Sequence, residues 1–449
     1  MNYEENEIAL LIIKNLKEGN RKALQLLLDE LHPYDIAKQY KQLSDKYKQK
    51  FLYYLSTEEL TSLIQELDKD LQLEALNKLS KQKSSQVLDL MENDDIVELL
   101  SDLTDENVNE ILSNMKAEES TVVKKLMNYP PESAGRIMTD RYVWVRQHYT
   151  VREAIDKLKE FAEIAESLNY LYVIDDERRI VGVVSYKDLI LANLDDKIHD
   201  IMYTKVITVS ALTDQEEAAK LIERYDFVSI PVVEDDNKLV GIITVDDIID
   251  VVIEEANEDI VKLAASGKDI TFKTKPFIAA WRRLPWLVVL LFIGLISGSI
   301  ITGFSDTLQQ VIALAAFMPM IIGMTGNTGT QSLAIVVRGL VSEELDGDLL
   351  INLILRELRV GFIIGLVCGA LVSIVGFVWQ GNIMLGLVVG GSLLTTLTIG
   401  TLSGTIIPLI LYKLKVDPAI ASGPLITTIN DILGLLIYFG IASAFISIL

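Results

Sequence analysis

Residues 418–449 read PAIASGPLITTINDILGLLIYFGIASAFISIL, and Asp431 is the only charged side chain in this apolar stretch. A carboxylate near the middle of a bilayer costs at least about 2.5 kcal/mol, so one that is kept there usually faces a water-filled path or a bound cation. The neighbours Thr427, Thr428 and Asn430 also carry oxygen. The alternative is a hydrogen bond from a protonated Asp431 to a neighbouring helix. We expect the function to depend on Asp431.

Charge divides the chain into two unlike parts. Residues 276–449 carry seven Lys or Arg and eight Asp or Glu, whereas the whole chain carries 41 and 63. A net charge of −21 therefore falls on residues 1–275, which are long enough for two soluble domains. Such a surface repels nucleic acid and attracts cations, although an acidic face can also serve solubility alone.

The apolar part predicts a bundle of five membrane-spanning helices. Their expected limits are about 286–304, 311–341, 352–379, 383–412 and 419–448. No charged residue occurs between Gly361 and Tyr412, as expected for a chain that lies in lipid. The single cysteine, Cys368, excludes disulfides within the chain and cysteine metal clusters, and it is consistent with a reducing cytoplasm.

Basic residues predict the orientation in a bacterial-type cell membrane. They flank the start of the first span and the second and fourth connections, and they are absent from connections 305–310 and 380–382. The positive-inside rule then places the soluble part in the cytoplasm and Leu449 outside. Asp417 falls at the cytoplasmic mouth of the fifth span, with Asp431 about 21 Å of helix deeper.

Small and polar residues interrupt the spans. The segment Gly326–Gln331 (GNTGTQ) predicts helix unwinding, which survives in a membrane only beside protein or a water-filled cavity. Gly423 and Pro424 predict the same at the start of the fifth span. Broken helices that direct carbonyl oxygens at a central carboxylate would form a cation path. Glycines recur at four-residue spacing and predict close helix packing, at Gly294/Gly298, Gly365/Gly369, Gly386/Gly390 and Gly400/Gly404.

An internal duplication occupies the middle of the soluble part. Each copy predicts a strand, a helix, two strands joined by an acidic turn, and a second helix, with VGVVSYKD at 181–188 aligned to VGIITVDD at 240–247. The pattern resembles a tandem pair of CBS domains. As a family, such α/β pairs often bind adenine nucleotides and regulate an attached enzyme or transporter, so ATP or another adenine nucleotide is a candidate ligand. The contacting residues are not assigned.

Acids crowd one end of the second copy and the helix that follows it. On the expected helix 245–265 several acids recur at three or four residues, which is destabilising unless cations bind. A cation-sensing helix is one interpretation, and an exposed acidic helix is the other. The crowded residues are Glu216, Asp226, Asp246, Asp247, Asp250, Glu254, Glu255, Glu258 and Asp259.

The N-terminal part reads as wholly helical. Apolar residues recur at helical spacing, and short acidic turns open each new helix with a capping-type residue. Pro130 and Pro131 mark the next boundary. The expected domains are an acidic helical stack at 1–129, the tandem CBS pair at 130–250, a connecting helix and linker at 251–275, and the membrane bundle at 276–449.

Taken as a whole, the chain resembles the MgtE family of magnesium channels. The order of parts covers nearly all 449 residues, and the specific motifs are Pro319 with Gly326–Gln331 and Asp417–Pro418 with Gly423–Asp431. The resemblance implies a homodimer with the ion path on the dimer axis, Asp431 holding hydrated Mg²⁺, and closure by cytoplasmic Mg²⁺. The implied pore residues are Asp431, Asp417, Asn327 and Thr428. The implied regulatory residues are Glu59, Asp94 or Asp95, Glu216, Asp226, Asp247, Asp250, Glu255, Glu258 and Asp259.

Other classes of protein remain as alternatives. An ion-coupled secondary transporter of Mg²⁺, Co²⁺ or Mn²⁺ could use Asp431, and a membrane-tethered sensor of adenine nucleotides would not transport at all. An anion channel would need basic residues inside the spans, and 361–412 contains none. An enzyme is not expected, because the chain has no Walker-type loop or nucleophile constellation and its three histidines, His32, His148 and His199, are scattered.

Overall fold

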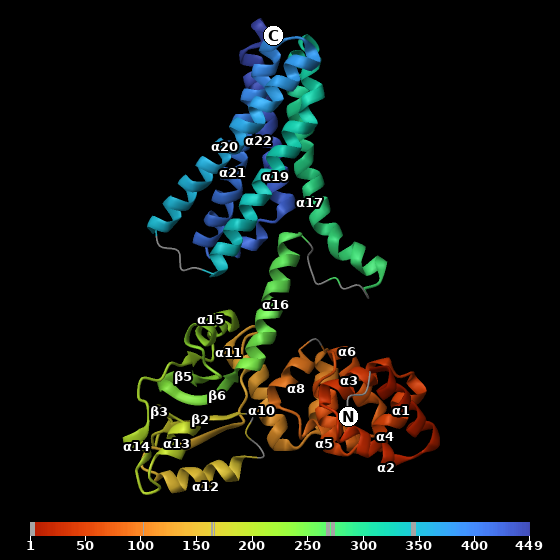
Figure 1. The fold of residues 1–449 in the computed structure, drawn as a ribbon, viewed down its shortest axis with the longest axis vertical. Coiled ribbons are helices and arrows are strands. Elements are labelled where there is room, and N and C mark those ends of the chain that lie inside the picture. The colour runs from red at the N-terminus through yellow and green to blue at the C-terminus, as the bar shows by residue number, and fades with distance from the viewer. Residues whose placement is uncertain are drawn as a thin grey trace. The chain divides into compact units, whose positions relative to one another are not determined.

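The computed structural model describes residues 5–101, 103–162, 165, 167–265, 270, 274–342 and 347–449. Its chain forms two compact units, Met1–Ile253 and Glu254–Leu449, and the boundary falls within helix α16 (Val245–Leu263). Most of the linker predicted after this helix, at 266–269 and 271–273, lies outside the described residues. Figure 1 shows the elements of each unit.

The N-terminal part of the first unit is helical throughout its described residues, as predicted. Side-chain caps fix several helix starts; Ser56 and Glu59, for example, form a capping box in which each side chain bonds the other's backbone N–H. The helices are α1 (Glu5–Glu18), α2 (Arg21–Leu28), α3 (Pro33–Gln42), α4 (Asp45–Tyr54), α5 (Thr57–Gln65), α6 (Lys69–Lys78), α7 (Lys81–Leu88), α8 (Asn93–Leu100), α9 (Asp105–Asn114) and α10 (Ala117–Met127).

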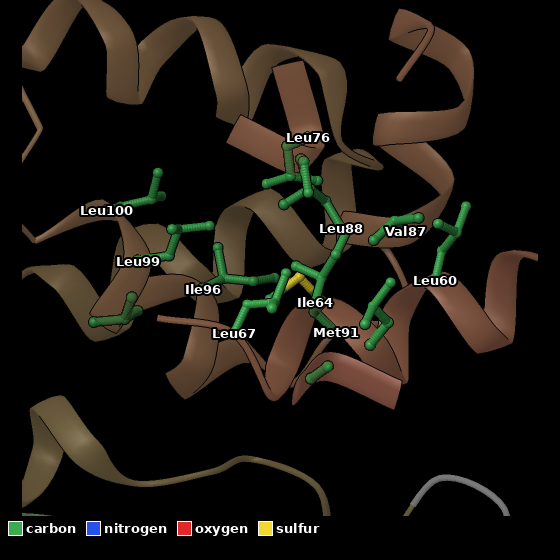
Figure 2. Close-up of a cluster of buried hydrophobic side chains, with 14 of the residues drawn as sticks. Leu60, Ile64, Leu67, Leu76, Val87, Leu88, Met91, Ile96, Leu99 and Leu100 are labelled. Carbon is green, nitrogen blue, oxygen red and sulfur yellow. The ribbon is translucent and has the colours of Figure 1, made fainter. Parts of the chain in front are cut away.

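A continuous apolar core joins these short helices. Leu60 and Ile64 of α5 and Ile96 of α8 are fully buried and lie close together in Figure 2. The same core continues into the second repeat through Ile243 and Val251. Helices of about ten residues are marginal alone, so burial of these side chains is what stabilises them.

Two three-stranded sheets with the same topology confirm the predicted duplication. In each, the first strand pairs parallel to the middle strand, and the third pairs antiparallel to it. The first repeat contains α11 (Ala134–Ile137), β1 (Tyr142–Arg146), α12 (Val151–Phe161), β2 (Ser167–Ile174), β3 (Ile180–Ser185) and α13 (Tyr186–Leu191). The second contains α14 (Ile198–Ile201), β4 (Val209–Ser210), α15 (Gln215–Tyr225), β5 (Ser229–Glu234), η1 (Asp235–Asn237), β6 (Lys238–Thr244) and the start of α16. The first strand of the second repeat, β4, is only two residues long.

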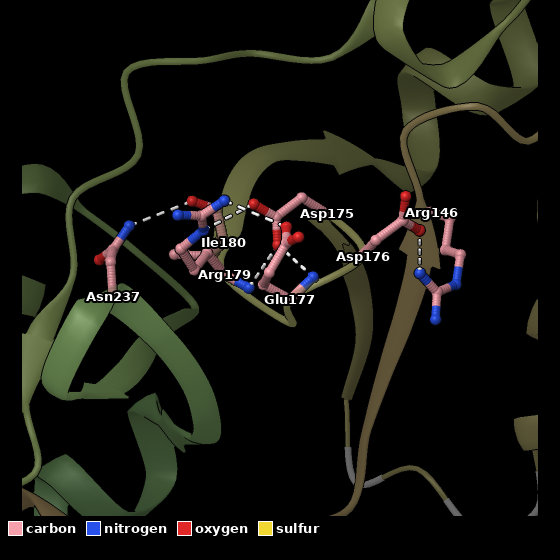
Figure 3. A network of polar contacts seen from close by, with 7 residues as sticks. All are labelled: Arg146, Asp175, Asp176, Glu177, Arg179, Ile180 and Asn237. Carbon is pink, nitrogen blue, oxygen red and sulfur yellow. Dashed lines mark hydrogen bonds and ion pairs between the residues drawn. The ribbon is translucent and has the colours of Figure 1, made fainter.

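Polar contacts fix the acidic turn between β2 and β3 and join it to the second repeat. Asp175 accepts hydrogen bonds from the backbone N–H and the Nε of Arg179, both at 2.8 Å (Figure 3). Asn237 donates to the Ile180 carbonyl at 3.1 Å. A buried hydrogen bond of 2.8 Å between Tyr172 Oη and Ser229 Oγ links the two sheets. The acids of this turn therefore have structural partners.

The second unit contains five long helices among its described residues. They are α17 (Pro276–Gly303), α19 (Ala313–Ser342), α20 (Gly347–Gln380), α21 (Ile383–Lys413) and α22 (Gly423–Ala444), with short elements α18 (Ser305–Gln310), η2 (Pro418–Ile420) and η3 (Ile446–Ile448). By length and composition four of them could cross a membrane: α17, the Leu350–Gln380 part of α20, α21 and α22. Helix α19 has the length but carries the polar segment GNTGTQ.

The predicted unwinding at Gly326–Gln331 is wrong. Helix α19 runs without a break from Ala313 to Ser342, and the glycines serve close packing against α21 and α22 instead. At Gly423 the prediction holds in part, since η2 and a short irregular segment precede α22, and Pro424 occupies the first turn of that helix.

Glycines set the helix spacing in this bundle. A Cβ atom on Gly404 of α21 would overlap the carbonyl oxygen of Gly329 of α19, and one on Gly369 of α20 would lie 2.6 Å from the carbonyl oxygen of Gly390. The small-residue pattern thus marks real contacts there. In α17 a Cβ atom on Gly294 or on Gly298 would meet nothing within 4 Å, so this glycine pair makes no close helix contact among the described residues.

We predict that Gly404→Ala lowers the stability of the bundle by about 1–3 kcal/mol, because the added methyl group meets backbone that cannot rotate away. Thermal unfolding of the full chain in detergent measures the effect. The matched control is Gly298→Ala, which adds the same methyl group where no atom is near. Equal unfolding temperatures for the two variants would contradict the packing role.

Candidate cation pathway and acidic cluster

Asp431 lies in α22 where that helix faces the glycines of α19. Its side chain is half-buried, and Oδ1 is buried without a hydrogen-bond partner among the described residues. A Cβ atom on Gly326 would lie 3.7 Å from this oxygen. A desolvated carboxylate oxygen with no donor is unfavourable by itself and suits a cation or its hydration water.

The adjacent Asn430 fixes how α22 packs. Its side chain is fully buried, accepts a short hydrogen bond from Ser403 Oγ, and donates to the carbonyl oxygens of Thr325 at 3.4 Å and Gly400 at 3.5 Å. These partners belong to α21 and α19. Because neighbouring residues on a helix point about 100° apart, this anchoring restricts the direction in which Asp431 can point.

Two other predicted pore residues, Thr428 and Asn327, lie on α22 and α19. Thr428 Oγ1 donates to the Pro424 carbonyl at 2.8 Å, which leaves its oxygen able to accept or coordinate. Asn327 follows Gly326 on α19 and is exposed. Their roles as ligands remain predictions.

Asp417 caps η2 at the start of the α22 segment. Its Oδ1 accepts from the Ala419 N–H at 2.8 Å, and its Oδ2 contacts Lys262 Nζ at 2.7 Å. Lys262 also contacts Glu258 Oε1 at 2.7 Å. Desolvation alone would lower the pKa of the Lys262 ammonium, but its hydrogen bonds to Asp417 and Glu258 outweigh this and hold the pKa above its ordinary value.

Six acids gather in the first unit between α8 and the start of α16. Burial, followed by the charge of Asp95, raises the pKa of Glu92 to about 7. Burial also raises the pKa of Asp95 and Asp250, and the neighbouring charges of Glu98 and Asp246 add to both shifts. We call these residues the acidic cluster: Glu92, Asp95, Glu98, Asp246, Asp247 and Asp250.

The structure brings together only some of the predicted regulatory residues. Asp95, Asp247 and Asp250 lie in the acidic cluster, and Asp94 is buried beside Asp95 on α8. Sequence reasoning did not assign Glu92 or Glu98 to this site, and it named Asp246 only among the crowded acids, not among the regulatory residues. The spacing of three between Glu92, Asp95 and Glu98, which places them on one helix face, was the available signal.

The remaining predicted residues have local roles or lie elsewhere. Glu59 is engaged in its capping box and by Gln25, Glu216 pairs with Lys220 at 2.9 Å, and Asp226 ends α15 in a left-handed conformation. Glu255, Glu258 and Asp259 lie on the part of α16 that belongs to the second unit. Within the described ranges no three Asp, Glu, His or Cys side chains converge closely enough to enclose a metal ion.

These features define a class of protein: a membrane-embedded helical bundle that contains a carboxylate with one buried oxygen lacking a partner among the described residues, joined to an acidic soluble part. A family model described as "Divalent cation transporter" matches residues 318–441. The model "MgtE intracellular N domain" matches 31–132, and "CBS domain" matches 134–195 and 198–254.

Known proteins match nearly the full length. "Magnesium transporter MgtE" of Bacillus subtilis is 59% identical over 445 residues, 99% of either chain. The protein of the same name from Thermus thermophilus is 36% identical over 444 residues, 98% of either chain.

Solved structures match the soluble part. "Crystal structure of the soluble part of a magnesium transporter" has a TM-score of 0.54 and 36% identity, and covers 56% of this chain and 100% of that one. "Crystal structure of the cytosolic domain of the Mg2+ channel MgtE in complex with ATP" has a TM-score of 0.52 and 32% identity, and covers 54% and 99%. The chain therefore belongs to the MgtE family, a family of transporters rather than enzymes.

We predict that the acidic cluster makes stability fall as the pH rises when divalent cations are removed. The pKa of Glu92 is raised from 4.5 to about 7, so the folded chain keeps this proton where the unfolded chain has lost it. The resulting stabilisation is complete below pH 4.5 and is lost as the pH rises through 7. The shift corresponds to about 3 kcal/mol, reduced to about 2 kcal/mol because the side chain is partly exposed. Thermal unfolding of the full chain in EDTA from pH 5 to 8 measures it.

Glu92→Gln should remove this share of the pH dependence, because the amide does not ionise. The exposed Glu106→Gln, on α9, is the control and should leave the slope unchanged. A slope that is the same in wild type and Glu92→Gln would exclude Glu92 as its source.

Proposed function

We propose that this protein is a Mg²⁺ channel for uptake into the cytoplasm, closed by cytoplasmic Mg²⁺. One observation carries the proposal: the buried Asp431 Oδ1 has no hydrogen-bond partner among the described residues although it lies within an apolar bundle. The names of the full-length relatives support Mg²⁺ as the transported ion.

The proposed path passes Asp431 and leads to Asp417. Mg²⁺ releases its water reluctantly and is commonly bound through one or two carboxylates with several waters retained. One carboxylate per subunit on the axis of a homodimer, with Asn327 and Thr428 as further oxygen donors, suits recognition of the hydrated ion. The soluble part lies in the cytoplasm and Leu449 outside, in accordance with the basic residues at the helix ends.

The proposed sensor is the acidic soluble part with α16. Without Mg²⁺ the acids of the cluster repel one another; burial is the main cause of the raised pKa of Glu92, and the charge of Asp95 adds to it. Mg²⁺ relieves that repulsion and stabilises the closed arrangement, so the transported ion inhibits its own uptake. The other predicted acids, Glu59, Asp94, Glu216, Asp226, Glu255, Glu258 and Asp259, complete the proposed set.

An adenine nucleotide is a second proposed ligand, at the CBS pair. The solved cytosolic domain of a relative is described in complex with ATP. The nucleotide would modulate the Mg²⁺ response, and we assign it no catalytic role.

Asp431→Asn should abolish Mg²⁺ influx without unfolding the chain, because the amide keeps the shape and removes the charge. The purified protein is placed in vesicles that hold a Mg²⁺-reporting dye, with no proton gradient. Asp306→Asn removes an exposed carboxylate of the same unit and should conduct normally. Unchanged influx in Asp431→Asn would take this residue out of the ion path, and wild-type influx only under an imposed gradient would indicate coupled transport.

Combined neutralisation of Asp247, Asp250 and Glu258, to Asn, Asn and Gln, should leave the channel open at high internal Mg²⁺. The reason is that these carboxylates contribute to the proposed sensor on α16. The same vesicles with internal Mg²⁺ preset low or high measure this. Neutralising three exposed acids elsewhere, Glu106, Asp195 and Asp235, is the control for charge alone. Retained closure in the first variant would place the sensor outside these residues.

A further inference from the structure

A lysine already occupies the space between two carboxylates at the mouth of the bundle. Lys262 Nζ, in the last turn of α16, lies 2.7 Å from Glu258 Oε1 and 2.7 Å from Asp417 Oδ2. One contact is within α16, and the other crosses to the chain that leads into α22. The ammonium therefore neutralises charge at a place where the proposed function expects Mg²⁺.

Apolar packing holds the end of α16 in the same place. Leu263 packs against a cluster formed by Leu333 and Val337 of α19 with Ala419 of η2 and Ile426 of α22. A Cβ atom on Gly423 would lie 3.5 Å from the Leu263 carbonyl oxygen. The end of α16 is thus held against η2, α19 and α22 by two kinds of contact: the ion pair of Lys262 with Asp417 and the apolar packing of Leu263.

An ammonium and a hydrated Mg²⁺ compete for this space. Each offers positive charge to the same carboxylate oxygens, but only the lysine is covalently attached and is present at every Mg²⁺ concentration. If the lysine is removed, Glu258 and Asp417 lose their shared partner and repel each other across the contact. The seated arrangement of α16 would then depend on metal.

We propose that Lys262 is a tethered cation that stands in for Mg²⁺ at the mouth and provides a metal-independent component of closure. The inference rests on the proposed function and adds a residue that sets the basal activity of the channel. Its consequence is that some channels stay closed when internal Mg²⁺ is scarce. The difference in influx between low and high internal Mg²⁺ is therefore smaller than the metal sites alone would give.

Lys262→Met tests this, because methionine keeps most of the side-chain length and removes the charge. In vesicles with vanishing internal Mg²⁺, influx should rise roughly two- to fivefold, as for the loss of a partly screened ion pair. At saturating internal Mg²⁺ closure should be retained, since the metal then bridges the vacated carboxylates. Lys262→Arg, which keeps the charge, should behave as wild type.

A matched control exists within the chain. Lys78 contacts Glu74 four residues earlier and Asp45 of another helix at 3.3 Å, which is the same arrangement of contacts in the N-terminal helices. Lys78→Met should leave both the basal influx and the Mg²⁺ response unchanged. A rise in Lys78→Met as large as that in Lys262→Met would assign the effect to lost ion pairs in general and overturn the proposal.

Hydrogen exchange gives a readout that does not depend on transport. Without Mg²⁺, amides in the last turn of α16 should exchange faster in Lys262→Met than in wild type, and Mg²⁺ should restore protection. Unchanged basal influx with unchanged exchange would overturn the role of Lys262, as would failure of Mg²⁺ to close Lys262→Met. If the wild type shows no influx at all, the proposed function fails, whereas the exchange result still decides whether Lys262 holds the end of α16.

Discussion

A carboxylate that must remain inside an apolar bundle is the constraint on which the rest of the membrane part depends. Asp431 is desolvated by its neighbours, and its Oδ1 lacks a hydrogen-bond partner among the described residues. Asn430, one position away, is anchored to α19 and α21 by polar contacts, which fix the orientation of α22 at Asp431. The glycines of α19 and α21 allow those helices to approach closely enough for the anchoring to occur.

Buried carboxylates also occur in the soluble part, where several of them lie close together in the acidic cluster. In the acidic cluster, burial and like charges raise the pKa of Glu92, Asp95 and Asp250, so protons or cations are needed to stabilise the packed form. At the second unit's mouth a lysine supplies the positive charge instead. Under the proposed function, Mg²⁺ bound at the acidic cluster would report its concentration, whereas the tethered Lys262 would not.

Prediction from the sequence succeeded where the signal was local or periodic. The duplication at 181–188 and 240–247 and the helical N-terminal part depend on neighbours in the chain, and the structure confirms them. The predicted capping is confirmed at Ser56, but Glu92 makes no side-chain cap hydrogen bond. The interpretation of Gly326–Gln331 failed because glycine has two roles, helix breaking and close packing. The role of a glycine depends on whether another helix packs against it. Helices α21 and α22 pack against the glycines of this segment, so here they serve close packing.

The sequence by itself determined the division into acidic soluble and apolar membrane parts, the repeat, and the isolation of Asp431 in an apolar stretch, because hydrophobicity and charge are properties of the residues alone. Only the tertiary structure decided that Glu92 lies near Asp247, that Glu98 lies near Asp250, and that Lys262 contacts Asp417. These pairs are separated by up to 155 residues or depend on which rotamer a side chain adopts. Electrostatic interactions of a few ångströms are set by packing, which no pattern along the chain encodes.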